Sequence, residues 1–122
     1  MIKKIIPFVP AKNYFLCKSF FEDLGFKKHL ETDEFTEFKS GSESFYLQNF
    51  YVKEWAKNCV IKLWVHDLDS WSDKGNFIIT SKKYPEIQML GPKMFPWGLQ
   101  EIHLIDPSGV LWQFALIAEN TP

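Results

Sequence analysis

The stretch Leu99–Ile117 reads LQEIHLIDPSGVLWQFALI, in which two apolar runs flank the tetrapeptide Asp106-Pro107-Ser108-Gly109. Asp in the first position and Pro in the second position of such a tetrapeptide favour a type I turn. The runs at 99–105 and 110–117 have the length and residue types of strands. We therefore predict that this stretch forms a strand pair around a tight turn.

The residues before this strand pair predict a strand, a helix and a further strand. The segment 59–65, CVIKLWV, has the β-branched and aromatic content of a strand. The remaining elements are expected to be a helix capped by Asp67 or Asp69, an interruption at Gly75-Asn76, a resumed helix at 77–84, a weak strand at 87–90 and a loop at 91–98. The second half of the chain thus has the predicted order β-α-β-β-β.

The first half predicts the same order. Asn13 can cap a helix that runs to about Asp23, and Gly25 lies where a C-terminal glycine of a helix belongs. The predicted strands lie at 2–8, 26–31, 34–39 and 43–48. The chain therefore repeats its element order, although the residues themselves do not repeat.

Length and composition limit the architecture to one sizeable core. The chain has 122 residues, of which 46% are hydrophobic and 24% charged, as in an ordinary globular domain. Aromatic residues reach 17%, which is more than a small core needs. We expect the excess aromatic surface to line a pocket or an oligomer contact.

The charge and the cysteines exclude several classes of protein. A net charge of −1 gives no electrostatic reason to bind nucleic acid or a membrane surface. Cys17 and Cys59 lie far apart without the spacing of a disulfide framework or a zinc site. No secretory signal or membrane-spanning run is apparent, so we expect a cytoplasmic protein with reduced thiols.

Three short motifs carry a family resemblance that covers essentially the whole chain. FFEDLGF at 20–26, VHDLD at 65–69, and PWGLQE at 96–101 followed by DPSGVLW at 106–112 resemble signatures of the vicinal oxygen chelate superfamily. The pattern is most similar to the bleomycin resistance proteins of its glyoxalase/bleomycin resistance group. The resemblance implies one α+β domain over 1–122 with two βαβββ modules, at about 1–50 and 59–122. Together these modules would form a curved mixed sheet with the helices on its convex side.

The resemblance also implies where a metal would lie in the metalloenzymes of the superfamily. Counting from the motifs, the ligand positions are occupied here by Ile5, Val60 and Gln113, with Gln48 near a fourth position. Ile and Val have no donor atoms, and a lone Gln amide does not hold a divalent cation. We therefore expect neither a family-type metal site nor a cofactor.

Strand alternation then selects candidate site residues. Trp64 lies opposite the Ile61/Leu63/Val65 stripe, and Glu101 and His103 lie opposite Ile102 and Leu104. With Gln113 at the former metal position and Trp97 in the preceding loop, the predicted ligand-binding residues are Trp64, Trp97, Glu101, His103 and Gln113. Two alternatives stay open: Trp64 could pack against a partner subunit, and Glu101 with His103 could be a polar sheet edge. The faces taken by Tyr46 and Gln48 are not determined, and His29 and His66 are expected at the surface.

Two functions from different classes fit these residues. The favoured one is a metal-free homodimer, with or without exchange of its first strand, that sequesters an aromatic or amphipathic molecule in clefts between the subunits. Glycopeptide antibiotics of the bleomycin type are among the candidate ligands, although these drugs are cationic and a net charge of −1 offers them little attraction. The alternative is a metal-independent isomerase or lyase that uses Glu101 and His103. A third possibility is a degenerate member that serves protein interaction.

Overall fold

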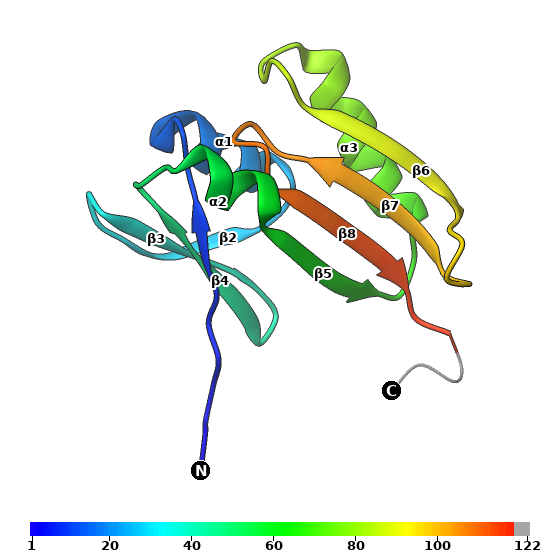
Figure 1. Cartoon of the computed structure of the whole chain (residues 1–122), viewed down its shortest axis with the longest axis horizontal. Coiled ribbons are helices and arrows are strands. Elements are labelled where there is room, and N and C mark those ends of the chain that lie inside the picture. Colours follow the sequence, from blue (N-terminus) through cyan, green and yellow to red (C-terminus); the bar gives the residue numbers. More distant parts are fainter. Residues whose placement is uncertain (119–122) are drawn as a thin grey trace.

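A computed structural model describes residues 1–118, and in it each half of the chain forms one four-stranded sheet (Figure 1). The first half contains β1 (Phe8–Pro10), α1 (Tyr14–Asp23), β2 (Lys27–Glu31), β3 (Phe35–Ser40) and β4 (Glu43–Gln48). A short helix, α2 (Lys53–Asn58), connects it to β5 (Val60–Val65), α3 (Asp69–Ser81), β6 (Gln88–Met94), β7 (Gln100–Ile105) and β8 (Leu111–Leu116).

The two sheets have the same topology. Their strand orders are β1-β4-β3-β2 and β5-β8-β7-β6, and in each sheet the first strand is parallel to the last while the other pairs are antiparallel. This confirms the predicted α+β fold of two βαβββ modules. None of the helices in residues 1–118 is long and apolar enough to cross a membrane.

The caps predicted for α1 are confirmed. The Asn13 side chain accepts a hydrogen bond of 3.1 Å from the backbone N–H of Leu16, which satisfies one of the free donors at the start of the helix. Gly25 follows the helix with φ of +106°, a conformation that favours glycine. Short-range chemistry therefore sets both ends of α1.

The predicted interruption of the second helix at Gly75-Asn76 is wrong, because α3 runs unbroken from Asp69 to Ser81. Gly75 is buried against β6, where an added Cβ would collide with the Sδ of Met89. The glycine therefore lets the helix approach the sheet closely, and the packing gained outweighs its poor helix propensity.

Two strand predictions also need correction. β1 begins at Phe8 rather than Ile2, because residues 2–6 have no neighbouring strand among residues 1–118 and extend away from the body as an arm (Figure 1). β6 continues through the predicted loop to Met94, since an irregularity between Leu90 and Lys93 accommodates the intervening glycine and proline. The helix α2 was not predicted.

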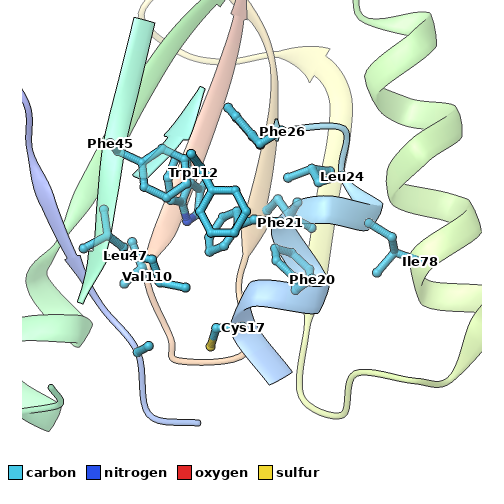
Figure 2. Close-up of a cluster of buried hydrophobic side chains, with 14 of the residues drawn as sticks. Cys17, Phe20, Phe21, Leu24, Phe26, Phe45, Leu47, Ile78, Val110 and Trp112 are labelled. Carbon is cyan, nitrogen blue, oxygen red and sulfur yellow. The ribbon is translucent and has the colours of Figure 1, made fainter. Parts of the chain in front are cut away.

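The core joins the two modules through α1. Phe21 is fully buried, and its ring centroid lies 5.0 Å from that of Phe45 on β4 and 5.1 Å from that of Trp112 on β8. Figure 2 shows these aromatic side chains converging between the sheets, with Leu24 and Ile78 beside them. Much of the aromatic excess in the sequence therefore belongs to this core.

The β7–β8 turn contains a buried carboxyl group. Burial raises the pKa of Asp106 to about 6, although Trp112 Nε1 and the backbone N–H groups of Ser108 and Val110 donate to it and favour its charged form. Because the folded state binds this proton more tightly than the unfolded chain, the contribution of Asp106 to stability rises as the pH falls through 6 towards 4.

The variant Asp106→Asn tests this pH dependence. Between about pH 7.5 and about pH 5, wild-type stability relative to the variant should rise by about 1 kcal/mol, because only the wild type takes up the proton. Denaturant unfolding of both proteins at the two pH values measures this difference. A difference that is independent of pH, or that shrinks on acidification, would contradict the prediction.

Candidate functional site

The second sheet has one face packed on the core and one open face. Strand alternation and register bring Lys62, Gln113 and His103 into one row across β5, β8 and β7, and Trp64, Ala115 and Glu101 into the next row. Trp97 reaches the same place from the connection between β6 and β7. The five residues predicted from the sequence therefore lie together on this face, which we call the open face of the second sheet.

Glu101 is the buried centre of the open face. Its side chain has 0% exposure. Its Oε2 accepts hydrogen bonds from Lys62 Nζ at 2.7 Å and Trp97 Nε1 at 2.6 Å, and its Oε1 accepts one from His103 Nε2 at 2.8 Å. Burial opposes ionisation, but these three donors outweigh it, so the pKa of Glu101 lies below its ordinary value. Glu101 is therefore a charged group that organises its neighbours.

Lys62 contacts most of the predicted site residues, although it was not itself among them. Besides Glu101, its ammonium lies 3.4 Å from Gln113 Oε1 and 5.7 Å from the ring centroids of both Trp64 and Trp97. The alternation that placed Trp64 also places Lys62 on the open face. No pattern in the sequence pairs Lys62 with a carboxylate 39 positions away.

Aromatic rings stack beside this charged group. The Phe95 ring lies 4.0 Å from that of His103 and 5.2 Å from that of Trp97, and the planes of each pair are within about 21° of parallel. Phe95 is buried, whereas 53% of Trp97 and 43% of Trp64 remain exposed. The open face thus presents two accessible indoles on a rigid support.

A cavity of about 410 Å³ opens along β5 between the two modules. Lys62 and Trp64 form part of one wall, the hairpin residues 40–45 form part of the other, and Ile5 of the arm lies at its edge. Its apolar lining combines aromatic and aliphatic side chains: Phe26, Phe45, Trp71, Trp112, Ile61, Leu63 and Val65. This volume and lining suit a small apolar or aromatic group.

The first sheet carries a related cluster on its own open face. Glu37 on β3 is buried, and its carboxylate accepts a hydrogen bond of 2.8 Å from His29 Nδ1 and lies 3.8 Å from Lys4 Nζ. The pKa of Glu37 lies below its ordinary value, chiefly because of the bond from His29. Glu37 was not among the residues predicted from the sequence, where His29 was expected only at the surface.

Tyr46, whose orientation the sequence left undetermined, lies in register between Phe8 and Glu37 on the open face of the first sheet. Its ring stacks on Phe35 at 4.9 Å and meets Phe8 edge to face at 5.1 Å. Gln48 shares this face because it is two positions further along β4. Each module therefore combines a buried Glu, a His, a Lys and aromatic rings on one face.

The residues at the positions implied for a metal do not fit one. Ile5 lies in the arm before β1 rather than on a strand, and Val60 presents an aliphatic side chain on β5. Gln113 supplies a single amide oxygen, which already lies beside Lys62. Within residues 1–118 no three His, Cys, Asp or Glu side chains are grouped to hold a metal ion. No chemical step is therefore assigned to a metal.

The two thiols are poor nucleophiles. Burial raises the pKa of Cys17 to about 11, although its bond to the Ser108 hydroxyl favours the thiolate. Burial also raises the pKa of Cys59. Both cysteines are free, and at neutral pH both are protonated.

The fold resembles solved structures along nearly its whole length. A bleomycin-binding protein complexed with bleomycin has 20% sequence identity, covers 96% of this chain and 100% of its own, and superposes with a TM-score of 0.77. A bleomycin resistance determinant encoded on the transposon Tn5 has 21% identity, coverage of 94% and 98%, and a TM-score of 0.76. A lactoylglutathione lyase from Agrobacterium tumefaciens has 15% identity, coverage of 95% for both chains, and a TM-score of 0.68.

No protein-family model and no curated protein sequence matches the chain. The similarity to the solved structures is therefore one of fold, and it confirms the resemblance predicted from the sequence motifs. The chain has the glyoxalase/bleomycin resistance fold. Because proteins of one fold perform different functions, the function has to be argued from the site itself.

Proposed function

We propose that the chain binds a planar aromatic or amphipathic small molecule without a metal and without turnover. The observation that carries this proposal is the pair of half-exposed indoles, Trp64 and Trp97, whose ring centroids each lie 5.7 Å from the Lys62 ammonium. Trp64 also lines the cavity. Indoles offer a stacking surface, and a few fixed polar groups orient a ligand. Two structural neighbours are described as bleomycin-binding or bleomycin resistance proteins, so glycopeptide antibiotics are one class of ligand to test.

The same proposal includes a homodimer with the ligand clefts between the subunits. Ile2 and Ile5 in the arm are 73% and 79% exposed, and the open faces of both sheets carry large apolar side chains. A second copy of the chain would cover these surfaces, and its arm would pack in place of this one if the first strand is exchanged. The Glu37 cluster of one copy could then face the Glu101 cluster of the other.

The enzymatic alternative receives less support from the geometry. A general base must reach the proton of its substrate. Glu101 has no exposed surface and both of its oxygens accept hydrogen bonds, so it is better placed to hold Lys62, Trp97 and His103 in position. Binding without turnover is therefore the function that the site favours.

Replacing Trp64 with alanine tests the binding proposal. We expect the variant to bind a ligand found by a thermal-shift screen of aromatic metabolites and bleomycin-type drugs about 1–3 kcal/mol more weakly, because a stacking surface is lost. Calorimetric titration in the presence of EDTA measures the affinity. The matched control is Trp55→Ala, which removes an indole of α2 outside the site.

Sedimentation of the same samples accompanies the titration, because Trp64 could also contribute to the dimer contact. The wild type should sediment as a dimer at micromolar concentration. Unchanged affinity in a dimeric Trp64→Ala protein would show that the indole is not part of the ligand site. Sedimentation of the wild type as a monomer would contradict the proposal that the ligand clefts lie between subunits.

A further inference from the structure

The open face of the second sheet has an asymmetric distribution of charge. Its charged side chains are Lys62 on β5, Glu101 on β7 and Lys93 on β6, and the imidazole of His103 lies among them. Lys93 is directly opposite Glu101 in the register, so the two side chains share a face. The face thus combines two ammonium groups with one carboxylate.

The carboxylate is not available to a ligand. Glu101 is fully buried, and Lys62, Trp97 and His103 together occupy both of its oxygens. A cationic ligand would have to displace one of these donors before it could contact the carboxylate. It would also approach two ammonium groups of like charge, which is unfavourable.

Both cations, in contrast, are accessible. The Lys62 side chain is 33% exposed, and its ammonium has three N–H groups, of which Glu101 and Gln113 take two. Lys93 is exposed, its ammonium lies 5.1 Å from the Phe95 ring, and within residues 1–118 it forms no salt bridge. Among the described residues, one N–H group of Lys62 and the Lys93 ammonium are therefore left without a carboxylate partner.

We propose that the ligand class of this site is a planar aromatic anion, whose acid group binds the Lys62 ammonium while its ring stacks on Trp64 or Trp97. This inference rests on the proposed binding function and narrows it. The ligand's ring would contact an indole while its acid group contacts the ammonium of Lys62, since that ammonium lies 5.7 Å from each indole centroid. Lys93 adds long-range attraction for the same charge. Glu43, on the opposite wall of the cavity, forms no ion pair with Lys62 and leaves its free donor available.

Three naphthalene probes with an anionic, a neutral and a cationic substituent test the ligand class by calorimetric titration: 2-naphthoate, 2-naphthamide and (2-naphthylmethyl)ammonium. We expect the naphthoate to bind about tenfold more tightly than the amide, as one charge-assisted hydrogen bond allows, and the ammonium to bind most weakly. Raising the salt concentration should weaken the binding of the naphthoate but not that of the naphthamide.

Variants of Lys62 locate the acid group. Lys62→Gln keeps a donor for Glu101 and should reduce the preference for naphthoate over naphthamide to about threefold or less. Lys62→Arg retains the charge and should retain the preference. Lys57→Gln on α2 removes an exposed lysine away from the site and should change neither affinity.

Each outcome is decisive. Equal affinities for the three probes, or tightest binding of the ammonium, would overturn the anionic class and leave small-molecule binding standing. A preference for naphthoate that survives in a folded Lys62→Gln protein would overturn the assignment to Lys62. If none of the probes binds the wild type, this inference is contradicted, whereas the proposed binding function is decided separately by the thermal-shift screen and the Trp64→Ala titration.

Discussion

Replacing Phe21 with alanine is expected to lower the free energy of unfolding by about 3–5 kcal/mol. The side chain has no exposure, and its ring contacts aromatic rings from both modules, including Phe38, Phe45 and Trp112. The alanine variant would leave a cavity at this position and would lose the side-chain contacts that hold α1 between the two sheets. Unfolding in urea or guanidinium chloride measures the loss.

Phe15→Ala is the matched control for this prediction. Phe15 lies on the same helix and is 78% exposed, and its ring contacts the Tyr14 ring and the Lys18 ammonium near the surface. Its removal should cost less than about 1 kcal/mol. Equal losses for the two variants would contradict the role of the buried aromatic core, because helix propensity favours alanine over phenylalanine at both positions.

Replacing Gly91 with alanine is expected to destabilise the protein by about 3 kcal/mol or more. Gly91 has φ of +98°, which costs a residue with a side chain about 1–2 kcal/mol. In addition, a Cβ atom there would lie only 2.5 Å from the carbonyl oxygen of Glu101. Backbone atoms cannot move aside as the end of a side chain can, so β6 would have to separate from β7.

Gly98→Ala separates the two costs. Gly98 also has a positive φ, of +87°, but an added Cβ meets nothing within 4 Å. This variant should lose only the conformational term of about 1–2 kcal/mol. Gly91 lies against β7, the strand that carries Glu101. The Gly91 variant should therefore also bind less ligand, in proportion to the fraction of the protein that is folded. A Gly91 variant as stable as the Gly98 variant would contradict the steric argument.

Local chemistry made several elements predictable. The Asn13 cap, Gly25 and the Asp106–Gly109 turn each act through neighbours within a few positions, and the structure forms them as predicted. The open faces followed from strand period, because side chains alternate regardless of what packs on them. Trp64, Glu101, His103 and Gln113 therefore lie on the predicted face.

Elements that depend on distant partners were not predictable in the same way. Glycine has a low helix propensity, which predicted a break at Gly75. In the structure α3 continues through Gly75, because β6 packs closely against it at this residue. The strand β6 passes through Gly91 and Pro92 because β7 pairs with both sides of the irregularity. The arm was predicted as strand from its residues alone, yet in the part of the chain that the structure describes residues 2–6 have no neighbouring strand.

The element order, the fold resemblance and the face of the candidate residues were predictable from the sequence, because motifs and periodicity are properties of short segments. The ion pair of 2.7 Å between Lys62 and Glu101 was not, because it joins residues 39 positions apart and the indole of Trp97 donates to the same oxygen. That contact needs β5, β8 and β7 in register and the β6–β7 connection folded over them. It leaves the carboxylate buried and the ammonium accessible, which determines the charge that the site presents to a ligand.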